Sequence, residues 1–259
     1  MLTNYHTHTY RCHHAYGTER DYVEMAAKRG FKALGFSDHS PYIFDGSYYS
    51  KHRMSLAETA EYVDNIRALS EEFGSSIQLL VGYEMEYYPS LFDRTVKYIA
   101  DLGCDYLILG QHFIGDEEVY SARTSDRQRF ERYISQTIEA MDTGLFTYLC
   151  HPDLCMYTED NAVLEKGYLK LCEAAKSRNL PVEFNLYGMA DGRHYPSETF
   201  FKIAASVGNV IVPGCDAHTP GRIGDPDELH TADAFAEKCG FKFTELTVEQ
   251  VLARKHLIK

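Results

Sequence analysis

The segment Asn4-Tyr5-His6-Thr7-His8 carries two histidines one residue apart, close to the start of the chain. In an extended strand successive side chains point to opposite faces, so His6 and His8 project to the same side. Two imidazoles on one side can bind a single ion, but histidine is also a common polar surface residue. The pair therefore indicates a metal site only together with other donors.

Such donors stand at the ends of seven predicted strands, which cover residues 4–8, 32–37, 77–83, 105–110, 145–150, 181–184 and 209–213. The polar residues at these ends are His6 and His8, Asp38 and His39, Glu84, His112, His151, Asn185, and Asp216 and His218. Carboxyl ends of parallel strands meet at one face of a barrel, so we expect these side chains to converge. Converging imidazoles and carboxylates would be left unpaired without a cation. Nitrogen and oxygen donors favour zinc, manganese or iron.

Helical patterns alternate with these strands and cover residues 18–29, 55–73, 89–102, 126–141, 162–178, 197–207 and 226–238. Ser55 and Glu58 have the spacing of a capping box, and Gly74 is typical of a helix end. Seven alternations without a break in composition predict one α/β domain over residues 1–259, a parallel barrel with its site at the C-terminal strand ends. An open doubly wound sheet is the alternative. The segment 241–259, with a short helix over 248–254, has no predicted place.

Composition and charge are those of an ordinary globular protein: 44% of the 259 residues are hydrophobic and 25% are charged. The net charge of -12 offers no basic surface for a long nucleic acid, which favours a small substrate. No apolar run approaches the roughly 18 residues of a membrane span, and the N-terminus lacks the features of a signal peptide. We therefore expect a cytoplasmic protein.

The seven cysteines are odd in number and form no CxxC pair, which argues against a disulfide framework. We expect reduced thiols. Cys12, Cys150 and Cys215 lie beside potential ligands in the sequence, but the prediction for all three is a packing role.

In order and strand placement, one set of motifs resembles the PHP (polymerase and histidinol phosphatase) superfamily of metal-dependent phosphoesterases over nearly the whole chain. The motifs are His6-Thr7-His8, His14, Asp38-His39, Gly82-Tyr83-Glu84, His112, His151-Pro152 and Asp216-Ala217-His218. The resemblance implies a distorted seven-stranded (βα) barrel, similar to a TIM barrel, with a trinuclear metal centre.

The resemblance also implies a division of the ligands among three divalent ions. One ion would be held by His6, His8, Glu84 and Asp216. Glu84 would bridge to a second ion held by His112 and His151, and a third would be held by His14, His39 and His218. His14 rather than the adjacent His13 matches the family motif, because it lies eight residues after His6.

A bridged pair of divalent ions can clamp phosphoryl oxygens and supply a bridging hydroxide as the nucleophile, so no protein nucleophile is needed. Arg193 and Arg222 resemble basic positions of the histidinol phosphatase branch, and they are predicted to contact the phosphate and, with Asp216, to be catalytic. Asn185 and His194 are predicted to line the substrate pocket. The remaining histidines His52, His230 and His256 are predicted to lie on the surface.

The length, the missing polymerase domain and the segments Gly110–Ile114 and Arg193–Ser197 resemble the stand-alone L-histidinol phosphate phosphatases. The resemblance implies hydrolysis of this small phosphorylated substrate in histidine biosynthesis. Acidic and aromatic partners for its leaving group are available at Glu86, Tyr87, Asp116, Glu117 and Asp191. One departure is the segment Asp153–Tyr157, which lacks the basic residue found after His151 in many such enzymes. The alternatives are a phosphodiesterase or nuclease acting on nucleotides or short oligonucleotides, and a non-catalytic metal-binding regulatory protein.

Overall fold

The computed structural model describes residues 1–259 and contains a parallel sheet of seven strands. Its strands, in sheet order, are β1 (Thr3–Asn4), β2 (Ala33–Phe36), β3 (Gln78–Met85), β4 (Tyr106–Leu109), β8 (Phe146–Leu149), β10 (Val182–Asn185) and β11 (Ile211–Gly214). All seven correspond to predicted strands. β1 is shorter than predicted, so His6 and His8 lie just beyond its end.

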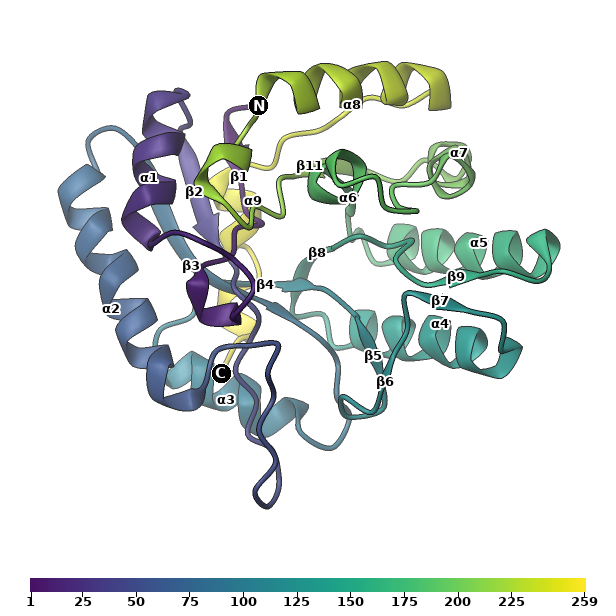
Figure 1. The fold of residues 1–259 in the computed structure, drawn as a ribbon, viewed down its shortest axis with the longest axis horizontal. Coiled ribbons are helices and arrows are strands. Elements are labelled where there is room, and N and C mark those ends of the chain that lie inside the picture. The colour runs from purple at the N-terminus through teal and green to yellow at the C-terminus, as the bar shows by residue number, and fades with distance from the viewer.

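Helices connect successive strands and cover the outside of the sheet (Figure 1). They are α1 (Glu19–Lys28), α2 (Leu56–Phe73), α3 (Phe92–Asp101), α4 (Arg127–Asp142), α5 (Asn161–Ser177), α7 (Glu198–Val207) and α8 (Pro226–Cys239). The predicted capping box is present at the start of α2, where the Ser55 backbone N–H donates to Glu58 Oε2 at 2.9 Å. Each predicted helix is therefore confirmed to within a few residues.

The first and last strands approach each other and nearly close the sheet into a barrel. The backbone N–H of His8 donates to the carbonyl of Ala217 at 3.0 Å, and the N–H of Ala217 donates to the carbonyl of His6 at 3.3 Å. The Asn4 side chain adds a contact, accepting from the Cys215 N–H at 2.9 Å. The predicted barrel is confirmed, and the open doubly wound sheet is wrong.

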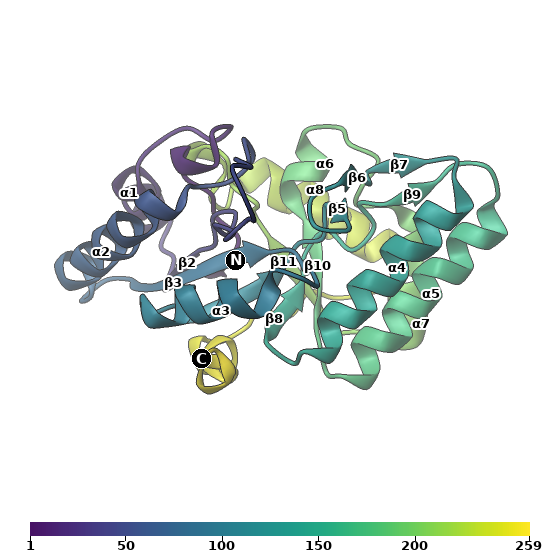
Figure 2. The same cartoon turned by 90° about the horizontal axis from the view of Figure 1, so that it is seen from below.

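The C-terminal segment covers the end of the barrel opposite the strand exits. It contains α9 (Val248–Leu252) and the 3-10 helix η3 (Lys255–Leu257), which lie below α3 in Figure 2. Val251 is fully buried and packs with Tyr5, Tyr106 and Tyr148, which fill the barrel interior. The tyrosine hydroxyl of Tyr5 donates to the Leu246 carbonyl at 3.1 Å. The segment without a predicted place thus plugs the barrel.

Smaller elements lie at the strand exits or follow them. The hairpin of β5 (Phe113–Ile114) and β6 (Val119–Tyr120) follows β4, and β7 (Arg123–Thr124) pairs with β9 (Met156–Tyr157). A short helix, α6 (Leu186–Ala190), follows β10, and two 3-10 helices are η1 (Tyr10–Cys12) and η2 (Pro220–Arg222). None of the helices has the length and apolar character that crossing a membrane requires.

Candidate metal centre

Glu84, near the end of β3, lies close to five histidines. Its carboxylate oxygens lie 2.6 Å from His151 Nε2, 3.1 Å from His39 Nδ1 and 3.7 Å from His112 Nε2. The Nε2 atoms of His6 and His8 lie 3.6 and 3.5 Å from it. Because these histidines come from different strand exits, the barrel brings together residues far apart in the sequence.

Asp216 provides a second carboxylate beside the same histidines. Its Oδ1 lies 3.0 Å from His8 Nε2, 3.5 Å from His6 Nε2 and 3.3 Å from His218 Nδ1. The ring of His14 completes the group, with its centroid 5.0 Å from that of His218. All nine predicted ligands therefore lie in one cluster. His13 points elsewhere and contacts the Tyr49 hydroxyl at 3.2 Å.

The backbone at the strand exits leaves room for the carboxylates. A Cβ atom at Gly110 would lie 1.8 Å from Glu84 Oε1, so any larger residue there would displace the carboxylate. His151 and Asp216 follow their strands with positive φ angles of 25° and 47°. Such conformations are unfavourable for residues other than glycine and occur where a functional side chain must be aimed.

Most of the histidines have one ring nitrogen held by a specific partner outside the cluster. His6 Nδ1 lies 2.6 Å from Glu183 Oε1, and His112 Nδ1 lies 3.2 Å from Glu86 Oε1. His8 Nδ1 lies 3.4 Å from Asp38 Oδ1. The Nδ1 atoms of His14 and His218 lie 2.7 and 2.9 Å from the carbonyl oxygens of Cys12 and Asp216. When Nδ1 carries the proton, Nε2 keeps its lone pair for a metal.

Glu183 is the functional residue that the sequence interpretation missed. It is fully buried in β10, and besides holding His6 its Oε2 accepts from the His151 N–H at 3.0 Å. The signal was available: Glu183 precedes Asn185 by two residues, and alternate residues of a strand point to the same side. A glutamate inside an otherwise apolar strand end needs such a partner to be buried.

The electrostatics of the cluster favour the metal-binding forms of its carboxylates. Burial would raise the pKa of Glu84, but His39, His112 and His151 hold that pKa well below its ordinary value. The pKa of Asp216 is likewise held low against burial by His6 and His218. Burial, with the neighbouring His8, lowers the pKa of His218 to about 3, and burial lowers the pKa of His39 well below its usual value. These directions favour the ionised carboxylates and the neutral imidazoles of His39 and His218, which are the metal-binding forms.

Unpaired atoms in the cluster show that the donors fit metal ions. His6 Nε2, His8 Nε2 and Asp216 Oδ1 are buried and have no hydrogen-bond partner. Three sets of side chains each bring their donor atoms within 4.8 Å of one another: His6, His8 and Glu84; His6, His151 and Asp216; and His8, His39 and His218. The first set agrees with the division that the family resemblance implies. Each of the other two sets combines residues that the resemblance assigns to different ions, so neighbouring ion positions would share ligands.

A pocket of about 450 Å³ opens onto the cluster. Outside the predicted ligands it is lined by Lys51, His52, Glu86, Phe113, Tyr120, Leu154, Tyr187, Arg193 and Tyr195. Its volume suits a small molecule. His52 is exposed, as predicted, and it also forms part of this lining, with its ring centroid 5.9 Å from that of Phe113. The other acidic candidates for the leaving group, Asp116, Glu117 and Asp191, do not line the pocket.

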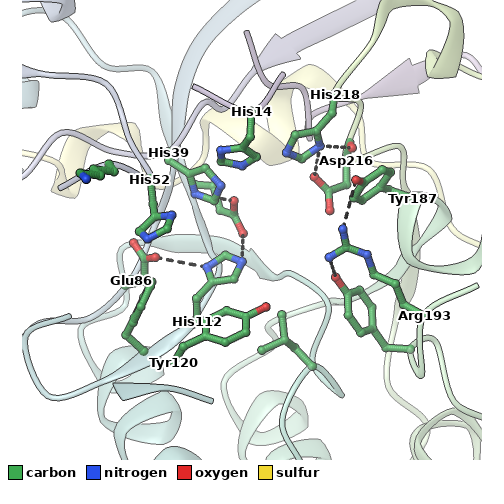
Figure 3. A pocket seen from close by; sticks show the side chains of 15 residues that line it. His14, His39, His52, Glu86, His112, Tyr120, Tyr187, Arg193, Asp216 and His218 are labelled. Atoms are coloured by element: carbon green, nitrogen blue, oxygen red, sulfur yellow. Dashed lines mark hydrogen bonds and ion pairs between the residues drawn. The ribbon is translucent and has the colours of Figure 1, made fainter. Parts of the chain in front are cut away.

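Arg193 is the predicted phosphate-binding arginine that the structure brings to the pocket. Its guanidinium lies 4.5 Å above the Tyr187 ring, and Nη1 and Nη2 donate to the hydroxyls of Tyr195 and Tyr187 at 2.9 and 3.1 Å. Nε donates to Asp191 at 3.0 Å. Figure 3 shows the Arg193 guanidinium beside Tyr187, across the pocket from His112.

The other three predicted substrate contacts lie outside the pocket lining. Arg222, in η2, is paired with Glu228 of α8. The Asn185 side chain lies behind Asp216, donates to its Oδ2 at 3.0 Å and caps α6 by accepting from the Gly188 N–H. His194 Nε2 contacts the Leu154 carbonyl at 2.7 Å. Each side chain already has a partner within the protein, and this directs it away from the cavity.

Comparison with known proteins assigns the chain to a family. Residues 4–186 match the family described as the PHP domain, and the chain belongs to this family. A protein of Deinococcus radiodurans named as a probable histidinol-phosphatase is 29% identical over 248 residues, covering 91% of this chain and 92% of that protein. The histidinol-phosphatase of Bacillus subtilis is 24% identical over 267 residues, covering 90% and 98%.

A solved structure shows the same barrel. The histidinol phosphate phosphatase of Lactococcus lactis, complexed with zinc, L-histidinol and phosphate, superposes with a TM-score of 0.71 at 22% identity. The match covers 93% of this chain and 95% of that one. The chain is an enzyme of the phosphatase class, as the motifs predict.

Proposed function

We propose that the protein hydrolyses L-histidinol phosphate to L-histidinol and phosphate and uses three divalent metal ions. The observation that carries this proposal is the convergence of nine nitrogen and oxygen ligands beside a pocket with an arginine on its opposite wall. The activities named for the Deinococcus and Bacillus relatives support the substrate. The zinc in the Lactococcus structure supports zinc as one of the metals.

The ligands assigned by the family resemblance would hold the ions at the end of the pocket. Bound divalent cations would polarise the phosphoryl oxygens and lower the pKa of water towards neutrality. Glu84 and Asp216, both ionised, keep the cluster negative enough to retain cations, and Glu183 holds His6 in the required orientation. No serine or cysteine is needed as a nucleophile.

Arg193 would orient the phosphate and stabilise the charge that develops on its oxygens. A planar guanidinium can offer two parallel N–H groups to phosphate, and Tyr187 and Tyr195 hold this one in place. The rest of the lining would accommodate the leaving group, since Phe113 and Tyr120 provide aromatic surface for an imidazole ring. This arrangement gives the pocket a phosphate end and a ring end.

The test compares substrates on one metal-loaded preparation. L-Histidinol phosphate should exceed p-nitrophenyl phosphate, a dinucleotide and a sugar phosphate in kcat/KM by about 10²-fold or more, because unmatched polar groups in a pocket penalise analogues strongly. The variant Asp216→Asn, purified identically, controls for contaminating phosphatases. Comparable rates on all four compounds would leave a general phosphoesterase, and preference for the dinucleotide would indicate a phosphodiesterase. Three bound metals without turnover would indicate a metal-binding protein.

A further inference from the structure

Arg53 is a buried arginine directly behind the wall of the pocket. It lies in the long connection between β2 and α2, and only 2% of its surface is exposed. Its three nitrogens are all engaged in hydrogen bonds. Nη1 donates to Glu86 Oε2 at 2.9 Å and to the Ser40 carbonyl at 3.0 Å, and Nε donates to Glu117 Oε2 at 2.9 Å. Nη2 donates to the Tyr88 hydroxyl at 3.0 Å.

Stability alone does not account for this arrangement. Removing an arginine and two carboxylates from water is costly, and apolar residues of similar volume often stabilise a protein as well or better. Glu86 is 1% exposed and Glu117 is 9% exposed, so one guanidinium faces two nearly buried carboxylates. The partners of these two carboxylates indicate what the arrangement achieves.

One of the two carboxylates contacts the His112 side chain, and the other lies in the hairpin that begins beside His112. Glu86 Oε1 lies 3.2 Å from His112 Nδ1 (Figure 3), whereas Glu84 faces the other ring nitrogen, Nε2. Glu117 lies in the turn of the β5–β6 hairpin, whose base is closed by the Ser121 N–H donating to the His112 carbonyl at 2.9 Å. Arg53 therefore holds the His112 side chain through Glu86 and the hairpin that begins beside it through Glu117.

His112 is less enclosed than the ligands His6, His8 and His151, so it needs this support more than they do. It follows β4 by three residues and is partly exposed, with 15% of its side chain accessible. By contrast, His6 and His151 are fully enclosed. Of the five histidines close to Glu84, His112 has the ring nitrogen that lies farthest from the carboxylate, with Nε2 at 3.7 Å. A small rotation of this ring would remove one donor from the cluster.

We propose that Arg53 is a positioning residue that, through Glu86 and Glu117, sets His112 in the orientation that binds metal. The inference rests on the proposed metal-dependent function. Arg53 itself touches neither substrate nor metal. Its loss should weaken the hold on the ion bound by His112 while leaving the remaining ligands in place.

The experiment measures metal retention rather than turnover. Wild type, Arg53→Met and Glu86→Gln are loaded with zinc, dialysed against a competing chelator of known affinity, and analysed for zinc per chain. Both variants should lose one equivalent at a chelator strength about 10- to 100-fold lower than wild type, the range expected for outer partners of metal-bound histidines. Arg67→Met is the matched control, because Arg67 makes a similar double contact to Asp105, at 2.8 and 2.9 Å, away from the pocket.

The outcomes separate positioning from mere stability. If Arg53→Met fails to fold, Glu86→Gln carries the test, since it preserves the shape of the side chain and removes its charge and one acceptor oxygen. Retention equal to wild type in a folded Glu86→Gln, or equal losses in Arg67→Met, would overturn the inference. Failure of wild type itself to bind zinc would instead refute the proposed function.

Discussion

At the scale of single residues, the donors of the site follow from the sequence better than the residues that orient them. A histidine or carboxylate at the end of a predicted strand marks itself as a potential ligand. The nine predicted ligands, eight from strand ends and His14 from the family motif, lie in the cluster. Arg53 carries no such mark, because its role depends on contacts across long sequence separations, and Glu183 is marked only by its alternation with Asn185 along a strand. The position of Arg222 is likewise not predictable from the sequence, because its ion pair with Glu228 keeps it outside the pocket.

Arg193 is expected to matter for catalysis without affecting metal binding. Arg193→Ala should lower kcat/KM on the best phosphate ester by about 10²-fold or more, the effect of losing a charge-assisted contact to the transition state of about 3 kcal/mol. Metal content, measured by elemental analysis, should equal that of wild type. Arg222→Ala should lose far less, because its guanidinium is engaged by Glu228. Wild-type kinetics in Arg193→Ala would show that Arg193 does not act in catalysis.

At the scale of elements, periodicity locates the long helices and buried strands but not the pieces between them. The capping box at Ser55 and the apolar strand over Tyr106–Leu109 are strong local signals. The strands β5, β6, β7 and β9 have only two residues each, which is too short for any periodic pattern. Their positions depend on tertiary contacts, and so does the placement of the C-terminal segment.

Asp105 connects α2, η3 and β3, and its charge should make the free energy of unfolding depend on pH. Its carboxylate accepts from Arg67 of α2, Lys255 of η3 and the Val81 N–H of β3. Burial would raise the pKa of Asp105, but these partners lower it. A lowered pKa stabilises the fold above the unfolded value of about 3.9, and this stabilisation is lost as the pH falls through the folded value.

Replacing Asp105 tests this expectation. Asp105→Asn should reduce the free energy of unfolding by about 1–3 kcal/mol at pH 7, since charged partners would lose their acceptor. Urea unfolding measured from pH 7 to pH 3 should show the difference from wild type shrinking below about pH 4. A difference that is constant across this range would mean that the charge of Asp105 is unimportant.

At the scale of the whole molecule, the crowding of donors predicts that stability depends on metal. Divalent ions bind only the folded arrangement, so a metal concentration 1000-fold above Kd adds about 4 kcal/mol to the free energy of unfolding. For a chain of this size that corresponds to roughly 10 °C in Tm. Thermal unfolding with and without a chelator should show this shift. An unchanged Tm would contradict a metal centre built from these residues.

The closure between Thr7 and Ala217 joins residues from the two ends of the barrel sequence. His6 and His8 emerge from the ribosome early, but Asp216 and His218 are synthesised some two hundred residues later. Pairings so distant are entropically costly and form late in folding. The centre therefore cannot assemble on a nascent chain that has not yet reached His218, and a truncated product that lacks β11 and the segment after it would have neither a closed barrel nor a complete ligand set. Metal capture would then report that synthesis has passed His218.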